Sequence, residues 1–490
     1  MSNTKQAFWV LLGSLSAFVF SIVSSMVLSR YMNKLDYGTF RQILYVYGSL
    51  VVVFSLGLPK TYSFFLPRLP IEEAKSAIGK INNLLLGSGI LMSLVLFFGA
   101  ETIASLLNNS KLITPLKYFS MVPVFLLPTI GLEGVLASFK KTQLLAAYNI
   151  VTKLVMLACV VLPVVLWNGG VESAVIGFTI ASFFAFLLAL FLKTQPVRNV
   201  TSKVTQLKYK EIFNYSTPLL FASLWGIVIL SSDQFFISRY FGTEVFAEFA
   251  NGSLQLPFVG MIVAATTIVL APIYSKKAFA DSPDSKQEII QLWNSVFSKT
   301  IKLTYPLIAF FFCFSDTVMV ALYGQAYINS GDYFKVKLIV DFFTLITYGP
   351  LIVSIGGNKY YYRVHMYIAL FLISTQWLSV HLINLPIAIV WISVTFQIIK
   401  TFALLVFIAK YFELKLYQIF PWSVIARVLP SFAILYGIQY VLDQRVQSIE
   451  PMLLLTIYGG LYLIIFLVWA YISKLDYLSI IKPLLKRNSI

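Results

Sequence analysis

Long apolar runs separated by short polar stretches dominate the pattern of this chain. A helix needs about 20 consecutive apolar residues to cross a membrane, and runs of that length recur from one end of the sequence to the other. They predict an all-α integral membrane protein with about fourteen transmembrane helices. The expected spans are 7–29, 42–66, 81–100, 116–138, 144–166, 172–193, 212–238, 249–273, 292–315, 334–356, 362–382, 385–409, 421–441 and 451–472.

The loops between these runs predict the orientation of the chain. Lys and Arg gather in the loops that share a side with the N-terminus, and the most basic of them is 194–211. Because cytoplasmic loops carry an excess of positive charge, both termini are expected in the cytoplasm. The first run, 7–29, is too long for a signal peptide and no clear cleavage site follows it. The sequence therefore predicts a multi-pass protein of the cytoplasmic membrane.

A short motif occurs twice along the chain. Ser29-Arg30-Tyr31 corresponds to Ser238-Arg239-Tyr240, and Tyr37-Gly38-Thr39-Phe40 corresponds to Phe246-Ala247-Glu248-Phe249. Each copy follows one long apolar run and precedes another, which indicates two similar halves of six spans. An even number of spans gives both halves the same orientation, so we expect a parallel repeat with a central cleft.

The repeat predicts three parts of the chain. They are an N-terminal six-helix lobe at 1–205, a C-terminal six-helix lobe at 206–412, and helices 13 and 14 with a cytoplasmic tail at 413–490. The tail, 474–490, alternates apolar and basic residues, which is typical of an interfacial helix on an anionic leaflet. A frayed basic end is the alternative.

Composition narrows the function further. The chain is 59% hydrophobic and only 12% charged, which excludes a soluble globular protein. Its net charge of +17 indicates an anionic lipid or substrate rather than nucleic acid. No phosphate-binding loop and no metal-ligand spacing is present, and the two cysteines lie in apolar runs. The sequence predicts no cofactor, no metal and no catalytic activity, and favours a transporter without ATP machinery.

Charges within or at the ends of the spans are the candidate site residues, because such groups are costly in hydrocarbon and face a cavity or each other. Lys60 follows Gly57-Leu58-Pro59, and Arg30 and Arg239 end equivalent spans. We predict that these three cations bind substrate. The alternatives are that Lys60 snorkels to the inner headgroups and that the arginines anchor the outer interface. Repeat symmetry places spans one, two, seven and eight along the cavity.

Three further charges have other expected roles. Asp233 has no charged counterpart in the first copy, where Ser24 stands, and lies on a different helix face from Arg239. We expect it to face the cleft. Glu133 and Lys153 lie at similar predicted depths in neighbouring spans, which favours a structural ion pair within the first half.

The repeated motif resembles the first helix pair of the polysaccharide transport family, the O-antigen and capsule repeat-unit flippases of the multidrug/oligosaccharidyl-lipid/polysaccharide exporter superfamily. Asp233-x-x-x-Ile237 with Gly242 and Phe246-x-x-Phe249 is similar to that family's signature near spans seven and eight, and Tyr323-Gly324-Gln325-Ala326-Tyr327 resembles its turn after span nine. The sequence departs from it at Ala247, where glycine is usual, and at Phe246.

The resemblance implies a flippase that moves an undecaprenyl-diphosphate-linked oligosaccharide repeat unit to the outer leaflet by alternating access. It implies Asp233 as the candidate for ion coupling. The expected partners are the lipid-linked oligosaccharide, membrane lipids, a polysaccharide polymerase and a chain-length regulator. A multidrug/cation antiporter and a lipid II flippase of the same superfamily remain alternatives. An O-antigen polymerase or ligase is disfavoured, because no large outer loop rich in Arg and His is seen.

Overall fold

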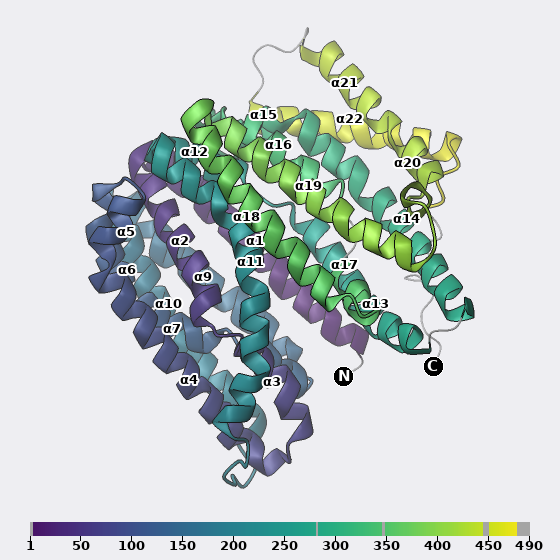
Figure 1. Cartoon of the computed structure of the whole chain (residues 1–490). Coiled ribbons are helices and arrows are strands. Elements are labelled where there is room, and N and C mark those ends of the chain that lie inside the picture. The colour runs from purple at the N-terminus through teal and green to yellow at the C-terminus, as the bar shows by residue number, and fades with distance from the viewer. Residues whose placement is uncertain (1–2, 281–282, 345–347, 444–449, 478–490) are drawn as a thin grey trace. The chain divides into compact units, whose positions relative to one another are not determined.

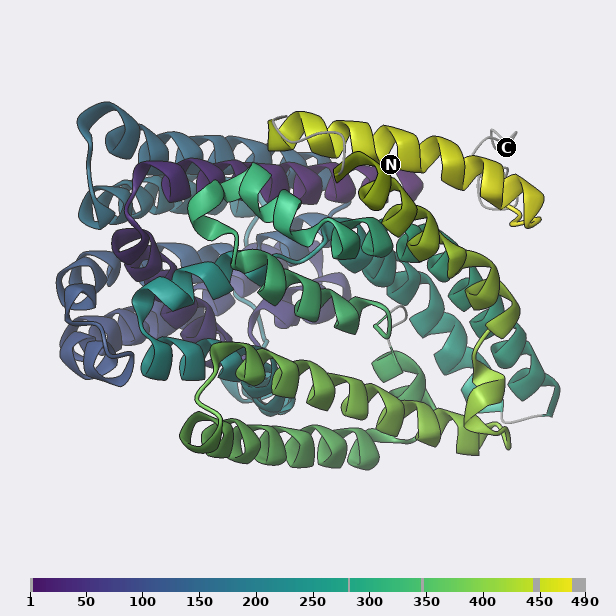
Figure 2. The same ribbon diagram turned by 90° about the horizontal axis from the view of Figure 1, so that it is seen from above.

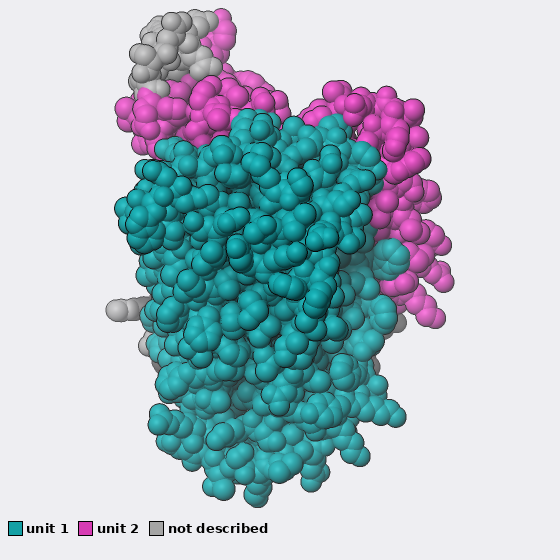
Figure 3. Space-filling model, turned by 90° about the vertical axis from the view of Figure 1, so that its left-hand side faces the viewer, with its two compact units in different colours: residues 1–250 teal, residues 251–490 magenta. Residues whose placement is uncertain are grey.

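A computed structural model of the chain describes residues 3–280, 283–344, 348–443 and 450–477 (Figure 1). Every regular element within these residues is a helix, so the predicted all-α fold is confirmed. The chain forms two compact units, residues 1–250 and residues 251–490, which are coloured separately in Figure 3. Most of the predicted tail helix, from residue 478 onward, lies outside the described residues.

The first unit, called unit 1, contains twelve α-helices and four short 3-10 helices. They are α1 (Asn3–Tyr31), α2 (Lys34–Phe54), α3 (Pro59–Phe65), η1 (Leu66–Arg68), α4 (Ile71–Phe98), α5 (Ala100–Leu106), η2 (Ser110–Leu112), α6 (Ile113–Phe119), α7 (Val122–Leu126), η3 (Leu127–Thr129), α8 (Leu132–Ser138), α9 (Thr142–Trp167), α10 (Val171–Thr194), η4 (Gln195–Val197), α11 (Tyr209–Phe241) and α12 (Thr243–Gly252), which ends at the boundary between the units.

The second unit, called unit 2, holds the remaining helices. They are α13 (Pro257–Ala280), α14 (Pro283–Cys313), α15 (Ser315–Tyr323), η5 (Gln325–Tyr327), α16 (Ser330–Asp341), α17 (Tyr348–Ser354), α18 (Asn358–Leu382), α19 (Pro386–Tyr411), η6 (Leu416–Ile419), α20 (Trp422–Val428), α21 (Pro430–Asp443) and α22 (Pro451–Ile472). Within this unit α18 packs against α19, and α21 packs against α22, the yellow helix in Figures 1 and 2.

The structure is that of a multi-pass membrane protein. Ten of its described helical stretches are long and apolar enough to cross a membrane, or eleven if α2 and the stretch Pro59–Arg68, which meet at a 40° bend, form one span. The predicted number of fourteen spans is therefore not confirmed. Two of the expected runs differ for local reasons: 334–356 divides between α16 and α17, and the first turns of α18 carry Lys359, Arg363 and His365.

Helix α11 belongs to unit 1 by its packing. It contacts α2 and α3, and two glycines permit the close approach. A Cβ on Gly57 would lie 2.5 Å from the carbonyl oxygen of Ser216 in α11, and a Cβ on Gly38 would collide with the carbonyl oxygen of Thr243, where α12 begins. The packing boundary at residue 250 therefore lies later in the chain than the predicted lobe boundary at 205/206, because α11 and most of α12 pack within unit 1.

Candidate functional site

The two copies of the repeated motif meet at one end of unit 1. Asn33 caps α2, accepting a hydrogen bond from the backbone N–H of Asp36 at 2.8 Å, and so sets the turn between α1 and α2. Lys34 at the start of α2 forms an ion pair of 2.5 Å with Glu248 of α12. The first copy is thus tied directly to the second.

A buried polar network joins the same elements more deeply. The amide nitrogen of Gln42 donates to the Ser238 hydroxyl at 2.7 Å, while its amide oxygen accepts from Asn109 at 2.6 Å. Asn109 also donates to the Thr39 hydroxyl at 2.9 Å. Gln42 and Thr39 are fully buried. Since an unsatisfied buried amide is costly, this network fixes the position of α11 against α2.

A cavity of about 330 Å³ opens beside this network. Its wall comes from α1, α2, α11 and α12, and carries five hydroxyl groups and one amide group within a mainly apolar bundle. The lining residues are Ser21, Ser25, Arg41, Leu44, Tyr45, Gly48, Ser49, Ser231, Gln234, Phe246 and Ala250. Spans one, two and seven, which repeat symmetry predicted along a cavity, contribute three of the four wall helices.

Arg41 supplies the positive charge of this cavity. Its guanidinium donates to the carbonyl oxygen of Ala250 at 2.8 Å and to the Tyr37 hydroxyl at 3.2 Å. Ala250 is the residue equivalent to Arg41 under the predicted repeat, 209 positions later. Arg41 is not among the predicted site residues, because it precedes the apolar run 42–66. Its position one turn after Tyr37, on the same helix face, was the available signal.

Asp233 lies next to the cavity wall and is fully buried. One carboxylate oxygen accepts a hydrogen bond from the backbone N–H of Gln234 at 2.8 Å. The next residue, Gln234, lines the cavity together with Tyr45. The structure therefore brings Asp233 and Arg41 to the same end of unit 1, on helices that share one cavity.

Lys60 lies beyond the other end of α2. Leu56 and Gly57 adopt the left-handed backbone conformation, with φ of 52° and 68°, and Pro59 restarts the helix as α3. The side chain of Lys60 is exposed. Arg41 lies 13 residues (54 − 41) before the end of α2, which is about 20 Å at 1.5 Å per residue, and Lys60 lies beyond that end, after the 40° bend.

The two motif arginines differ in their surroundings. Arg30 ends α1 and is exposed. Arg239 is half-buried, and its guanidinium donates to the carbonyl oxygens of Ser105 and Leu106, the latter at 3.3 Å. These carbonyls end α5, where a cation satisfies unpaired acceptors and complements the helix dipole. In the structure Arg239 thus caps a neighbouring helix.

The ion pair predicted for Glu133 and Lys153 is not formed in this structure. Both side chains are exposed, and the ion pairs among the described residues involve other groups. Glu133 lies in the short helix α8, which a turn at Lys140 (φ 55°) separates from α9. A buried cation of this unit is instead Lys193, the last residue of the predicted span 172–193.

Residues 27–332 match the family model described as "Polysaccharide biosynthesis protein", and no curated protein matches the sequence. The fold is similar to that of the lipid II flippase MurJ in an inward closed conformation, with a TM-score of 0.71, 13% identity, and coverage of 96% of this chain and 100% of that one.

Two other solved structures share the fold. An inward-facing multidrug resistance MATE family transporter of the MOP superfamily has a TM-score of 0.64 and 12% identity, covering 81% of this chain and 94% of that one. A MOP superfamily transporter from Pyrococcus furiosus has a TM-score of 0.58 and 14% identity, covering 84% of this chain and 95% of that one. At these identities the likeness shows a common fold.

Proposed function

Because the chain belongs to the family of polysaccharide biosynthesis proteins, we propose that it is a flippase for an undecaprenyl-diphosphate-linked oligosaccharide repeat unit. It moves this lipid across the cytoplasmic membrane by alternating access and so serves cell-surface polysaccharide biosynthesis. Both termini lie in the cytoplasm, and the chain transports its substrate without chemical change. A polymerase and a chain-length regulator act on the exported unit.

The observation that carries this proposal is the polar, cationic cavity inside an apolar bundle. Serines 21, 25, 49 and 231 and Gln234 offer hydrogen bonds to sugar hydroxyls, and Arg41 offers charge to a phosphate. Within a low-dielectric surrounding a cation stabilises an anion far more than it does in water. A polyprenyl chain needs no polar path, because it is as apolar as the lipid around the protein.

The predicted cations take different parts in the proposal. Lys60 meets the diphosphate at the inner end of α2, and Arg41, with Arg30 at the end of α1, meets it at the outer end. Arg239 contributes charge to the same end while it caps α5. The hydrogen bond between Arg41 and its repeat equivalent Ala250 supports a pseudo-two-fold axis through this cavity, and with it the parallel repeat.

Asp233 is proposed to couple transport to an ion gradient. Its support is a fully buried carboxyl group beside the cavity wall, since buried ionisable groups in membrane spans mark ion or proton pathways. Asp233→Asn keeps the size and the hydrogen bond of the side chain but removes its charge. We expect this variant to bind substrate and to lose export.

The proposal is tested by deleting the gene from its native host and measuring both surface polysaccharide and the lipid-linked oligosaccharide retained in the membrane. We expect the polysaccharide to disappear and its lipid-linked precursor to accumulate. Unchanged surface polysaccharide would contradict the flippase. Complementation by Arg41→Lys should restore export, whereas Arg41→Gln, which keeps hydrogen-bonding groups but no charge, should give about tenfold less. Lys117→Ala, at a half-buried cation that pairs with Glu101 and lines no part of this cavity, is the matched control.

A multidrug/cation antiporter is the second candidate, and the buried carboxyl group of Asp233 beside the cavity favours it. A carboxylate attracts an organic cation, whereas Arg41 repels one. In that case deletion would leave the polysaccharide unchanged and would increase sensitivity to lipophilic cationic drugs. The same deletion strain therefore separates the two functions.

A further inference from the structure

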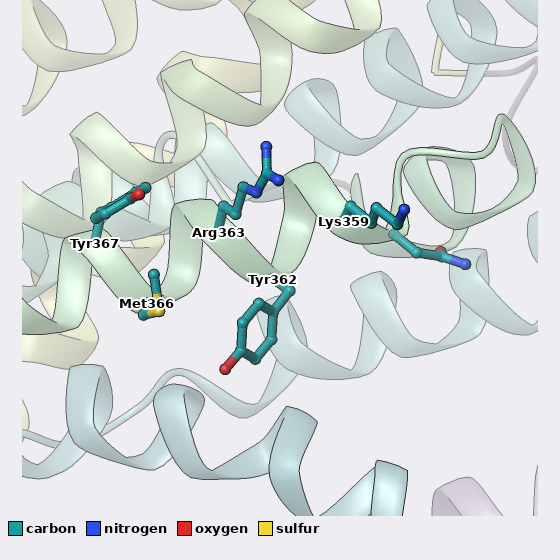
Figure 4. Close-up of a pocket in the computed structure, with 6 residues that line it drawn as sticks. Lys359, Tyr362, Arg363, Met366 and Tyr367 are labelled. Carbon is teal, nitrogen blue, oxygen red and sulfur yellow. The ribbon is translucent and has the colours of Figure 1, made fainter.

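An open surface hollow of about 390 Å³ lies along the beginning of α18 in unit 2. All of its lining residues come from the first turns of this one helix: Asn358, Lys359, Tyr362, Arg363, Met366 and Tyr367. Their spacing of three and four residues places them on one helix face. Figure 4 looks onto this face, where Arg363 and Tyr362 leave the helix at opposite edges.

The opposite face of α18 holds the helix in place. Tyr360 stacks on Phe407 of α19 with ring centroids 4.7 Å apart, and its hydroxyl donates to the carbonyl oxygen of Ala403 at 2.9 Å. Leu372, further along the helix, is fully buried. The lining residues therefore project from a helix whose position is fixed, and their common direction is a property of the fold.

The charge of this face is unbalanced. No Asp or Glu occurs between Asp341 and Glu413, a stretch that contains the whole α18–α19 hairpin. Lys359 and Arg363 lie one turn apart and form no ion pair or side-chain hydrogen bond with the described residues. The face thus presents two adjacent positive charges, and the positive end of the helix dipole adds to them.

Polarity changes along the same face. The cations lie in the first two turns, Tyr362 and Tyr367 follow with 46% and 53% of their surface exposed, and Leu370 and Phe371 come next with 49% and 61% exposed. A ligand that fits this order has a compact anionic head, a polar part that contacts tyrosine rings, and a long apolar chain. Two cations one turn apart match two adjacent phosphates better than one.

We propose that this face of α18 docks the diphosphate head of the lipid-linked substrate at the inner leaflet before the substrate enters the cavity of unit 1. The proposal rests on the proposed function for the identity of the lipid, and on the predicted orientation for the leaflet. Lys359 and Arg363 hold the two phosphates, Tyr362 and Tyr367 lie beside the first sugar, and the polyprenyl chain runs along Leu370 and Phe371.

The test uses the purified full-length protein in nanodiscs, with undecaprenyl diphosphate as the probe and native mass spectrometry as the readout. The variant Lys359→Gln/Arg363→Gln should retain at least about tenfold less probe than the wild type. The charge-preserving variant Lys359→Arg/Arg363→Lys should retain most of it. The control Lys410→Gln/Lys415→Gln removes two exposed cations near the end of α19 and should bind as the wild type does.

Phosphatidylglycerol in the same nanodiscs distinguishes a general lipid site. We expect the α18 variant to retain phosphatidylglycerol as the wild type does; equal loss of both lipids would show a site for any anionic headgroup and would overturn the proposal. Wild-type retention of undecaprenyl diphosphate by the double glutamine variant would overturn it as well.

Export measurements distinguish a failure of the docking site from a failure of the proposed flippase function. If the α18 variant exports polysaccharide normally while Arg41→Gln does not, the docking site is wrong and the flippase stands. If the wild-type chain restores no polysaccharide but the α18 variant still loses undecaprenyl diphosphate, the flippase is wrong and the binding site stands.

Discussion

The ammonium group of Lys193 lies 3.2 Å from the hydroxyl of Tyr62 in the core of unit 1. The same group donates to the amide oxygen of Asn82 at 3.1 Å and to the carbonyl oxygen of Pro128, so one buried cation joins α10 to α3, α4 and η3. Tyr62 follows Lys60 by two residues. Lys193 thus holds the short helix that presents the exposed cation at the inner end of α2.

The first prediction concerns this contact. Lys193→Met keeps a long apolar stem and removes the donors, leaving the Asn82 and Pro128 oxygens buried without them. We expect the protein to lose about 1–3 kcal/mol of unfolding free energy, measured as thermal or denaturant unfolding in detergent. Tyr62→Phe should cost less, about 1 kcal/mol.

A double-mutant cycle decides whether the two side chains act together. Lys193→Met combined with Tyr62→Phe should destabilise by less than the sum of the single changes, because the contact can be lost only once. Strictly additive losses would contradict the contact. Lys75→Met, which removes an exposed lysine of α4, should change stability little and serves as the control.

The second prediction concerns the packing of the Tyr62 ring against Gly131. Its ring packs over Gly131, where an added Cβ would collide with the ring atoms. Because Tyr62 is fully buried and cannot move outward, Gly131→Ala should cost about 1–3 kcal/mol by overpacking. Gly79→Ala, on a face of α4 with open space, should instead be neutral or stabilise by up to about 1 kcal/mol. Equal effects of the two substitutions on the unfolding midpoint would show that the Tyr62 ring moves aside to accommodate the added methyl group.

Much of the fold could be predicted from the sequence because its cause is local. The apolar runs indicate helices wherever they occur, and the family resemblance that rests on the repeated motif is confirmed by the match over residues 27–332. The Gly57-Leu58-Pro59 sequence combines two residues that disfavour a continuous helix, and the structure has a 40° bend there. Glycine and proline act on their own backbone, so their effect needs no knowledge of distant partners.

The candidate site could be predicted only in part, because its contacts are not local. Gln42 and Ser238 are 196 positions apart, and Lys193 and Tyr62 are 131 apart. A single polar residue in an apolar run gives no periodic signal, and loop cations cannot be told from buried ones by hydropathy alone. The expected pairing of Glu133 with Lys153 shows the same limit, since matching depth does not establish that two side chains face each other.

The third prediction tests the orientation. Residue 203 of the basic loop donates its backbone N–H to the carbonyl oxygen of Glu72 at 2.8 Å, and Lys80 donates to the carbonyl oxygen of Leu207 at 2.6 Å. Ser202 in this ordered loop is exposed. A cysteine at Ser202, in a chain whose Cys159 and Cys313 are replaced by alanine, should react with an impermeant thiol reagent only after the cells are opened. Labelling in intact cells would show that the loop lies outside and that the predicted orientation is wrong.

The last prediction concerns the charge at Lys60. This residue is exposed at the start of α3, beyond the end of α2 that lies away from Arg41, so the two cations can act on a passing diphosphate only at different stages. A transport site must release its substrate, so it needs positive charge more than an exact binding geometry. We therefore expect Lys60→Arg to retain export, Lys60→Ala to lose most of it, and Lys60→Glu to abolish it.

The measurement is surface polysaccharide in the deletion strain, normalised to the amount of protein in the membrane. Arg68→Ala, which removes a nearby cation that stacks on the Phe64 ring at 3.6 Å, is the matched control and should export at near the wild-type level. Because Lys60 makes no side-chain hydrogen bond with the described residues, a folding defect should not obscure the result. Wild-type export by Lys60→Glu would show that this lysine snorkels to the inner headgroups and takes no part in transport.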